Sequence, residues 1–365
     1  MKKITVILLV ALVLAACGGS KTDQSRKVDT FELALVTDLG TIDDKSFNQG
    51  AWEGLFMYAR ENNINSKYYQ PAEKSDDAYL SAIDLAVQGG AKIIVTPGYL
   101  FATPIFIAQD RYPDVHFILV DAEPNDGDWS SGFPVHRTAK NTVGILYAED
   151  QAGFLAGYAA VMDGNRSLGF MGGMAVPAVV RFGYGFVQGA EHAAQKLGLS
   201  AGSVTVNYYY TGGFEATPEI QTMSASWYNS GVEVIFACGG AVGNSVMSAA
   251  EQTGKKVIGV DVDQSGESPT VITSAMKGLR PSVYSCIADY YYDSFPGGET
   301  LVFDASNEGV GLPMETSKFD NFTEMQYAEV FFELQMGYVP RMDNLEESGS
   351  PSVVPVRITR VNEIK

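Results

Sequence analysis

The sequence is poor in the residues that build metal centres, disulfide frameworks and nucleic-acid surfaces. It has three cysteines and three histidines among 365 residues, and His116, His136 and His192 lack the spacing of metal ligands or of a catalytic triad. Basic residues number 25 against 43 acidic ones, for a formal net charge of −18. Nucleic acids and anionic lipids bind to positive surfaces. We therefore expect no metal, no catalytic residue and no nucleic-acid partner.

Long apolar runs are scarce as well, apart from one near the start. Met1-Lys2-Lys3 precedes an apolar run over residues 4–16, which is shorter than the roughly 20 residues of a membrane-spanning helix. A short positive start before a run of this length is typical of a secretory signal. Residues 1–16 are therefore predicted to be a signal peptide.

The run ends in Leu14-Ala15-Ala16-Cys17, which resembles the cleavage site of bacterial lipoprotein signals. There the cysteine carries a diacylglycerol and an N-acyl chain such as palmitate, and firm anchoring needs more than one chain. We expect Cys17 to be lipidated and residues 17–30, which are mostly polar, to form a tether. The alternative is an ordinary cleaved signal with an incidental cysteine.

The remaining chain has the composition of a large globular protein. Hydrophobic residues make up 46% and aromatic residues 11% of the sequence, which supports a full core. A chain of this length exceeds the roughly 250–300 residues of a single core, so two lobes are expected. Cys238 and Cys286 lie in apolar stretches and are expected to be buried as small hydrophobic residues, with a disulfide between them left open.

Short apolar runs alternate with amphipathic segments along the chain. Strands are predicted at residues 31–36, 92–95, 117–120, 167–170, 204–207, 234–237, 257–260 and 301–303. Helices are predicted at residues 48–62, 77–88, 181–197, 243–253, 281–294 and 324–336. This alternation indicates an α/β protein with two doubly wound parallel sheets, each covered on both faces.

The surplus of elements after the second run of strands predicts a chain that crosses between the lobes more than once. We expect an N-lobe at residues 31–142 plus about 268–298, and a C-lobe at 143–267 plus about 299–345. Residues 346–365 are expected to form an extended C-terminal strap. Ligands of such sheets bind in the crevice at the carboxyl ends of the strands.

Polar residues follow the first predicted strand in unusual density. Asp38 and Asp44 can accept hydrogen bonds, and Ser46 is a good helix cap. Phe47 opens the next helix, followed by Asn48, where the core does not require a large ring. Phe47 is therefore a candidate ligand contact, with a hydrophobic staple as the alternative.

The ends of later strands carry further candidates. Asp121 follows the strand at 117–120, and its carboxylate could accept from a base or a sugar, or cap a loop. Gly239 follows the strand at 234–237, where bare backbone can approach a ligand. Asp261 and Lys277 suit the vicinal hydroxyls of a sugar, although a surface ion pair is the alternative.

These segments together resemble the basic membrane protein family of substrate-binding lipoproteins, in particular its purine nucleoside receptor branch. The resemblance covers about residues 32–315. It is carried by DLGTIDDKSFNQ at residues 38–49 and, less specifically, by FLAG at 154–157, GFMGGM at 169–174 and VIGVD at 257–261.

The resemblance implies a type I periplasmic-binding fold that encloses a nucleoside between two lobes joined by a hinge. It implies stacking of the base between Phe47 and Phe214, with Phe182 in reserve, and a hydrogen bond from the base to Asp121. Asp261 and Lys277 would hold the ribose. Asp38, Asn48 and Gly239 would add polar contacts.

The implied function is capture of guanosine, inosine or adenosine for an ABC permease by a lipid-anchored monomer outside the cytoplasmic membrane, without a cofactor. Riboflavin and sugars are the alternative ligands, and a surface antigen or adhesin is an alternative role. An enzyme is disfavoured because no nucleophile–base pair accompanies Asp38, Asp43 and Asp44, which only imitate a metal-binding cluster. Attachment to the inner or the outer membrane stays open.

Overall fold

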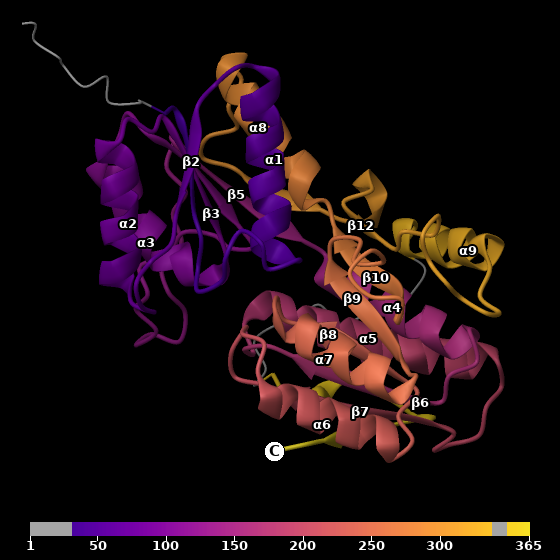
Figure 1. Ribbon diagram of the computed structural model, residues 1–365. Coiled ribbons are helices and arrows are strands. Elements are labelled where there is room, and N and C mark those ends of the chain that lie inside the picture. Colours follow the sequence, from indigo (N-terminus) through magenta and orange to yellow (C-terminus); the bar gives the residue numbers. More distant parts are fainter. Residues whose placement is uncertain (1–30, 338–348) are drawn as a thin grey trace, which may run out of the picture.

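The structure, a computed structural model, describes residues 31–337 and 349–365. The predicted signal peptide at 1–16, the lipidation site Cys17 and the tether at 17–30 lie outside the described residues. Within the described ranges no helix combines the length and apolar character needed to cross a membrane. The chain folds into two lobes, each built on its own sheet (Figure 1).

The sheet of the first lobe has six strands in the order β11-β5-β4-β3-β1-β2, and all neighbours are parallel. Their bounds are β1 Leu33–Val36, β2 Ser66–Tyr69, β3 Ile93–Pro97, β4 His116–Val120, β5 Thr142–Tyr147 and β11 Thr300–Phe303. In register, Leu33 of β1 lies beside Ile93 of β3, and Ile118 of β4 lies beside Val143 of β5.

The sheet of the second lobe has seven strands in the order β12-β10-β9-β8-β6-β7-β13. Their bounds are β6 Ser167–Gly172, β7 Val204–Tyr210, β8 Val234–Cys238, β9 Lys256–Asp261, β10 Val271–Lys277, β12 Val310–Gly311 and β13 Thr359–Glu363. Only the β10–β12 pair is antiparallel.

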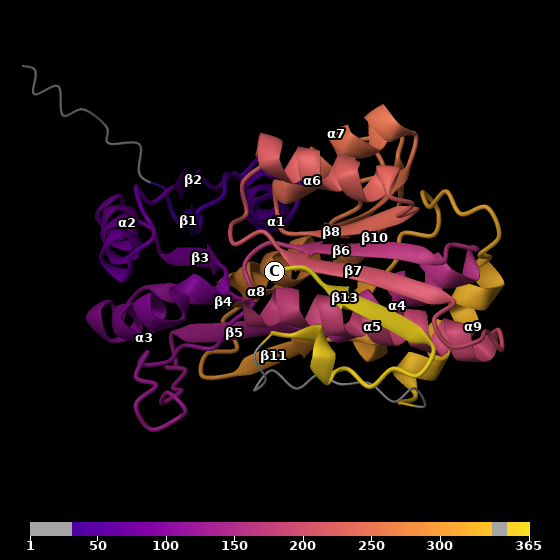
Figure 2. The ribbon, with the colours of Figure 1, turned by 90° about the horizontal axis from the view of Figure 1, so that it is seen from below.

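Helices cover both faces of each sheet, as the predicted doubly wound architecture requires (Figures 1 and 2). In the first lobe these are α1 Phe47–Glu61, α2 Asp76–Gln88, α3 Ala102–Arg111 and α8 Leu279–Tyr291. In the second lobe they are α4 Glu149–Met162, α5 Pro177–Lys196, α6 Pro218–Asn229, α7 Val242–Thr253 and α9 Glu324–Gln335. Short 3-10 turns lie at Tyr99–Phe101 in the first lobe and, later in the chain, at Ala305–Asn307 and Pro351–Val353. The six helices predicted from the sequence are confirmed, with ends displaced by a few residues.

The strands are apolar on both faces because both faces are buried. Leu33 and Leu35 of β1 pack on the side of α1 and α8, whereas Ala34 and Val36 pack on the side of α2 and α3. All four residues have no exposed surface. Such uninterrupted apolar strands are typical of parallel sheets between two helical layers.

Close packing of α4 against α5 brings together residues that later form part of the site. A Cβ at Gly153 or Gly157 would collide with the carbonyl oxygens of Phe182 and Phe186. Only glycine therefore allows the two helices to approach this closely. The approach places the start of α4, which bears Glu149, against the start of α5.

The chain crosses between the lobes three times, and the crossings differ from the predicted boundaries. β5 belongs to the first sheet, so the first crossing is after Tyr147 and not at residue 142. β10 belongs to the second sheet, so the segment returns to the first lobe near residue 278 and not at 268. β11 pairs with β5, which moves the last crossing from residue 299 to residues 304–309. The sheet that a short strand joins depends on long-range pairing, which local sequence does not specify.

The C-terminal segment is more than an extended strap, because β13 adds a parallel edge strand to β7 (Figure 2). It is fixed by Glu191 of α5, which is 5% exposed. The Glu191 carboxylate accepts hydrogen bonds from the backbone N–H groups of Arg357, Ile358 and Thr359. Part of the predicted strap, residues 346–348, lies outside the described residues, as do residues 338–345 of the predicted C-lobe.

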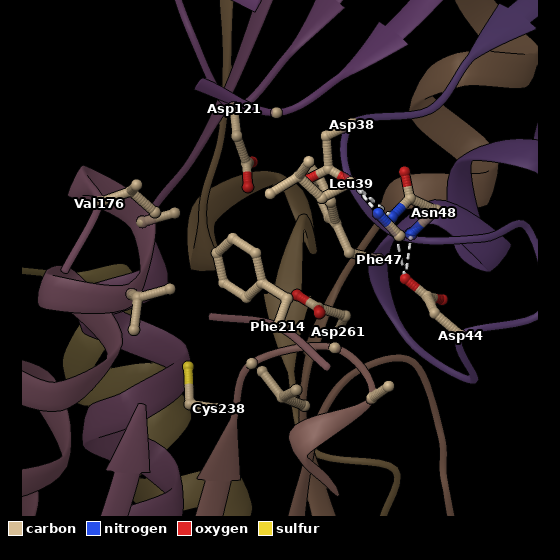
Figure 3. Close-up of a pocket in the computed structure, with 18 of the residues that line it drawn as sticks. Asp38, Leu39, Asp44, Phe47, Asn48, Asp121, Val176, Phe214, Cys238 and Asp261 are labelled. Atoms are coloured by element: carbon tan, nitrogen blue, oxygen red, sulfur yellow. Dashed lines mark hydrogen bonds between the residues drawn. The ribbon is translucent and has the colours of Figure 1, made fainter. Parts of the chain in front are cut away.

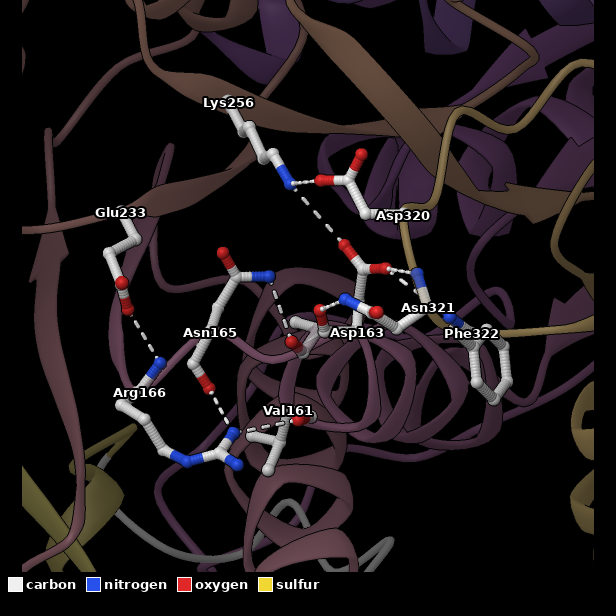
Figure 4. Close-up of polar contacts among 10 residues, drawn as sticks. Val161, Asp163, Asn165, Arg166, Glu233, Lys256, Asp320, Asn321 and Phe322 are labelled. Carbon is white, nitrogen blue, oxygen red and sulfur yellow. Dashed lines mark hydrogen bonds and ion pairs between the residues drawn. The ribbon is translucent and has the colours of Figure 1, made fainter.

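The segment after the third crossing is attached to the second lobe by a polar cluster (Figure 4). Asp163 Oδ1 accepts from the backbone N–H of Asn321 at 2.7 Å. Lys256 Nζ lies 2.7 Å from Asp320 Oδ2 and 3.4 Å from Asp163 Oδ2. Elsewhere, Cys238 and Cys286 are buried free thiols, as the apolar stretches around them predict.

Candidate ligand-binding site

A cavity of about 250 Å³ lies between the lobes, at the carboxyl ends of strands from both sheets. All nine ligand contacts expected from the sequence line it: Asp38, Phe47, Asn48, Asp121, Phe182, Phe214, Gly239, Asp261 and Lys277. Figure 3 shows Asp121 and Phe47 reaching into this space from the first lobe and Phe214 and Asp261 from the second. Residues separated by more than 200 positions thus share one cavity.

The first group of polar residues, the amide cluster, consists of Asp38, Asp44 and Asn48. Asn48 Nδ2 donates to Asp38 Oδ1 and to Asp44 Oδ2, both at 3.0 Å (Figure 3). These two bonds fix the orientation of the amide. Burial raises the pKa of both carboxyls, that of Asp44 to about 6 even though backbone N–H groups favour its charged form.

Asp44, and not Ser46, satisfies the free N–H groups at the start of α1. Its carboxylate accepts from the backbone N–H groups of Ser46, Asn48 and Gln49. Ser46 was expected to cap this helix, but its hydroxyl makes no capping bond and donates instead to Asp261 Oδ2 of the other lobe at 2.6 Å. Because Asp44 already accepts hydrogen bonds from the N–H groups at the helix start, the Ser46 hydroxyl is available for the contact across the cleft.

The aromatic candidates fall into two classes. Phe47 and Phe214 are partly buried, line the cavity and come from opposite lobes. Phe182 is 2% exposed and packs edge-on against Phe236 at 5.8 Å between ring centroids, so it forms the cavity floor within the core of the second lobe. Phe47 and Phe214 are therefore the rings available for stacking.

The second polar group, the lysine cluster, surrounds the buried ammonium of Lys277. Lys277 Nζ lies 2.6 Å from Asp121 Oδ2, 3.3 Å from Asp261 Oδ1 and 3.7 Å from Glu149 Oε1. It also lies 4.5 Å from the centroid of the Phe47 ring. Burial opposes the charge of Lys277, yet the three carboxylates raise its pKa above the ordinary value. Because these side chains are buried and bonded, the alternative of a surface ion pair does not apply.

Two members of the lysine cluster were missed in the sequence. Glu149 is fully buried, and its Oε2 accepts from Arg181 Nε at 2.6 Å. Both lie at helix starts that look like ordinary solvated positions in sequence. The only sign was the acidic first turn of α4, which also suits a helix N-terminus in general.

Asp121 is the residue predicted to accept a hydrogen bond from the base. It belongs to the lysine cluster, and burial raises its pKa to about 7, although Lys277 favours the charged form. Its Oδ1 atom is buried without a hydrogen-bond partner among the described residues. An acceptor in this state is open to a donor from a ligand.

The glycine loop after β8 lets the second lobe approach the cavity with bare backbone. A Cβ at Gly239 would lie 2.7 Å from the backbone nitrogen of Gly173. Gly240 adopts a left-handed φ of 56°. Residues larger than glycine would therefore push this loop out of place.

Direct bonds join the two lobes across the cleft. Besides the Ser46–Asp261 bond, Gln264 Nε2 donates to the carbonyl oxygen of Lys45 at 2.7 Å. Lys45 Nζ lies 3.5 Å from Glu267 Oε2. Lys45, Asp121 and Asp261 all have left-handed φ angles between 63° and 67°, an uncommon conformation for these residues that clusters at functional sites. The arrangement is that of a closed cleft.

Comparisons with known proteins agree with this geometry. A family model described as Bmp, ABC transporter substrate-binding protein PnrA-like, matches residues 31–336. The chain is 30% identical over 346 residues to the ABC transporter nucleoside-binding protein BmpA of Lactococcus lactis, covering 87% of this chain and 92% of the relative. It is 28% identical over 335 residues to Basic membrane protein A1 of Borrelia garinii, covering 88% and 93%.

Solved structures agree on the fold. A solute-binding protein of an ABC transporter system from Aeropyrum pernix has a TM-score of 0.69 at 23% identity, covering 85% of this chain and 87% of that one. A counterpart from Conexibacter woesei has a TM-score of 0.66 at 22% identity, covering 87% and 100%. At these identities the likeness concerns the fold alone, and it confirms the predicted type I periplasmic-binding fold.

Proposed function

Because this chain belongs to the family of PnrA-like ABC transporter substrate-binding proteins, we propose that it captures a purine nucleoside between its lobes and presents it for import. As a member of that family it is an extracytoplasmic binding protein and not an enzyme, and it works with a permease. The observation that carries the choice of ligand is one cavity that is lined by an aromatic ring from each lobe and by two separate polar clusters.

The base stacks between Phe47 and Phe214. Stacking on an aromatic ring contributes on the order of 1–3 kcal/mol per base and tolerates any base. The amide cluster lies next to Phe47 in the chain and faces the same cavity. Its carboxylates and oriented amide select a base that offers matching hydrogen-bond donors and acceptors.

The ribose lies at the lysine cluster. Asp121 and Asp261 accept hydrogen bonds from vicinal hydroxyls, and Lys277 donates to a hydroxyl oxygen. Asp121 Oδ1 supports this role, since it is a buried acceptor that no donor of the described residues contacts. We therefore assign Asp121 to the sugar and not to the base, because it shares the ammonium of Lys277 with Asp261.

The size of the cavity favours a nucleoside over riboflavin. A volume of about 250 Å³ is small beside the roughly 300–1,000 Å³ of common ligand pockets. The tricyclic ring and ribityl chain of a flavin would require the lobes to stand further apart. A sugar alone would leave the facing rings without a flat partner, and none of the three tryptophans lines the cavity.

The protein acts as a monomer held at the membrane by lipid on Cys17, after removal of residues 1–16. The tether at residues 17–30 gives the lobes freedom to reach a permease. Lobe closure around the nucleoside creates the surface that the permease recognises. Growth of cells with labelled palmitate would label the wild type and not Cys17→Ser if this anchoring is correct.

The ligand is tested by calorimetry on protein that has been unfolded and refolded to remove carried-over ligand. Guanosine, inosine and adenosine are expected to bind tightly, while uridine, ribose and riboflavin bind weakly. Phe47→Ala should weaken purine nucleoside binding about 10- to 100-fold, in line with the loss of one stacking ring. Phe56→Ala, an exposed ring of the same helix, is the matched control and should change little. Tight riboflavin binding with no response to nucleosides would overturn the ligand.

A further inference from the structure

The three crossings between the lobes form the hinge, and two members of the lysine cluster belong to it. Glu149 begins α4 at the first crossing, and Lys277 ends β10 at the second. Backbone bonds join the crossings, from Ala148 N–H to the Phe303 oxygen at 2.9 Å and from Gly278 N–H to the Gly309 oxygen at 2.8 Å. Glu149 and Lys277 therefore keep their separation better than any pair that spans the open cleft.

The carboxylates around Lys277 come from three different places. Asp121 belongs to the first lobe, Asp261 to the second lobe and Glu149 to the hinge. An opening rotation moves the first lobe with Asp121 away from Lys277. Asp261 and Glu149 remain, because both are attached to the side of the hinge that carries β10.

One carboxylate oxygen of Glu149 is available to contact Lys277 when Asp121 moves away. Its Oε2 is taken by Arg181, whereas its Oε1 is buried without a hydrogen-bond partner among the described residues, 3.7 Å from Lys277 Nζ. Arg181 is itself largely buried, with 13% of its side chain exposed, and its charge compensates that of Glu149. A buried carboxylate without such compensation would be strongly unfavourable.

We propose that Glu149, held by Arg181, is a positioning residue that takes over the ammonium of Lys277 when the lobes open. Lys277 then stays charged and directed at the cleft while Asp121 is withdrawn. This inference rests on the proposed function, in which the cleft opens and closes around a nucleoside. It makes the hinge, and not only the lobes, part of the binding machinery.

Loss of Glu149 would shift the unliganded protein toward the closed state. Without Glu149, Lys277 of an open molecule contacts only one carboxylate, that of Asp261. Closure adds the carboxylate of Asp121, so the closed state is favoured more strongly than in the wild type. A protein that closes before the ligand arrives must reopen to admit it. Its apparent association rate constant is therefore lowered in proportion to the fraction of molecules that remain open.

The test uses the double variant Glu149→Gln/Arg181→Met, which removes one charge of each sign and leaves no new unpaired charge. Small-angle scattering of the unliganded protein should give a smaller radius of gyration than for the wild type. Stopped-flow binding of inosine should show an association rate constant about tenfold lower. Glu149→Gln alone should shift both measurements in the same direction, as should Arg181→Lys if the double variant does not fold.

Glu191→Gln is the matched control, since Glu191 is a buried carboxylate on α5, the helix of Arg181, and fixes β13 away from the cleft. It should lower the melting temperature and leave both scattering and association unchanged. If the Glu149 variants behave in the same way, with lower stability alone, their role is structural and the inference is wrong. Scattering needs no ligand, so failure of the wild type to bind inosine would overturn the proposed function while the hinge is still tested.

Discussion

The two polar clusters of the cleft solve the problem of burying carboxylates in different ways. In the amide cluster, Asp38 and Asp44 are balanced by hydrogen bonds from Asn48 and from backbone N–H groups, and no cation of the described residues pairs with them. In the lysine cluster, Asp121, Asp261 and Glu149 are balanced by Lys277 and Arg181. The first cluster spans residues 38–48, whereas the second is assembled from residues 121–277.

The two clusters therefore act on a ligand in different ways, one through the direction of its hydrogen bonds and the other through its charge balance. The amide cluster is directional, because each donor points at one oxygen, and so it suits the discrimination of base edges. The lysine cluster depends on charge balance, and its members come from both lobes and the hinge. We therefore expect changes in the amide cluster to alter selectivity, and changes in the lysine cluster to alter both folding and the coupling of the lobes.

Removal of the lysine is expected to have the largest effect. Lys277→Met leaves three buried carboxylates without their ammonium, which should lower the free energy of unfolding by about 3–5 kcal/mol and abolish measurable nucleoside binding. Urea unfolding and calorimetry measure the two losses. Lys256→Met is the control, because Lys256 also contacts two carboxylates, Asp163 and Asp320, but at a partly exposed site outside the cleft (Figure 4). Equal losses of stability and of nucleoside binding in the two variants would show that the lysine cluster has no special role.

Disruption of the amide should have a smaller effect and one that depends on the ligand. Asn48→Leu removes the donor shared by Asp38 and Asp44, at a stability loss of about 1–3 kcal/mol. Affinity for guanosine and inosine should fall in unequal proportion, because the selecting groups have changed, while stacking on Phe47 remains. Titration of both nucleosides against the variant measures the ratio. An unchanged ratio would show that the amide cluster does not select the base.

The pH dependence of the free energy of unfolding should report on the protonation of Asp121 in the lysine cluster. Burial raises the pKa of Asp121 to about 7, so the folded protein binds a proton there that the unfolded chain, with an aspartate pKa of 3.8, has already lost. The free energy of unfolding from this group therefore falls as the pH rises from about 4 to about 7. Melting temperatures of the unliganded wild type and Asp121→Asn between pH 4.5 and 8 isolate the effect. His116 and His192, whose pKa values burial lowers, contribute the opposite slope in both proteins.

In this comparison the wild type should lose more stability than Asp121→Asn as the pH rises. Parallel curves for the two proteins would mean that the Asp121 carboxylate is ionised throughout, fully compensated by Lys277.

The smallest expected effect concerns a single bond between the lobes. Gln264→Ala removes the donor to the Lys45 carbonyl and should speed nucleoside dissociation about two- to tenfold, the value of one hydrogen bond. Gln109→Ala is the matched control, since Gln109 is equally buried and bonds only within the first lobe, to Arg137 and Ala139. Dissociation that is equally fast in both variants would argue against a latch at this position.

The accuracy of prediction from sequence follows the range of the interactions. The segment at residues 38–48 carries its own turn and helix start, so Asp38, Phe47 and Asn48 could be identified together. Ser46 was misassigned because its partner, Asp261, is 215 residues away. Arg181 and Glu149 were missed for the same reason, since nothing near either residue in the chain reveals their ion pair.

The lobe boundaries follow the same rule. β5 and β11 are short strands whose sheet is decided by parallel pairing with each other, across more than 150 residues of chain. Their apolar character indicates a strand but is compatible with either sheet.

Local order in the chain decided the alternation of strands and helices, the apolar cores on both faces of each sheet and the concentration of polar residues at the strand ends. These properties depend on residues close together in sequence, where periodicity and turn chemistry act. Tertiary structure decided that Asp121, Glu149 and Asp261 share one ammonium, that Phe47 and Phe214 line the same cavity, and that the hinge carries Lys277. Burial and charge balance act between residues close in space, which only the folded chain brings together.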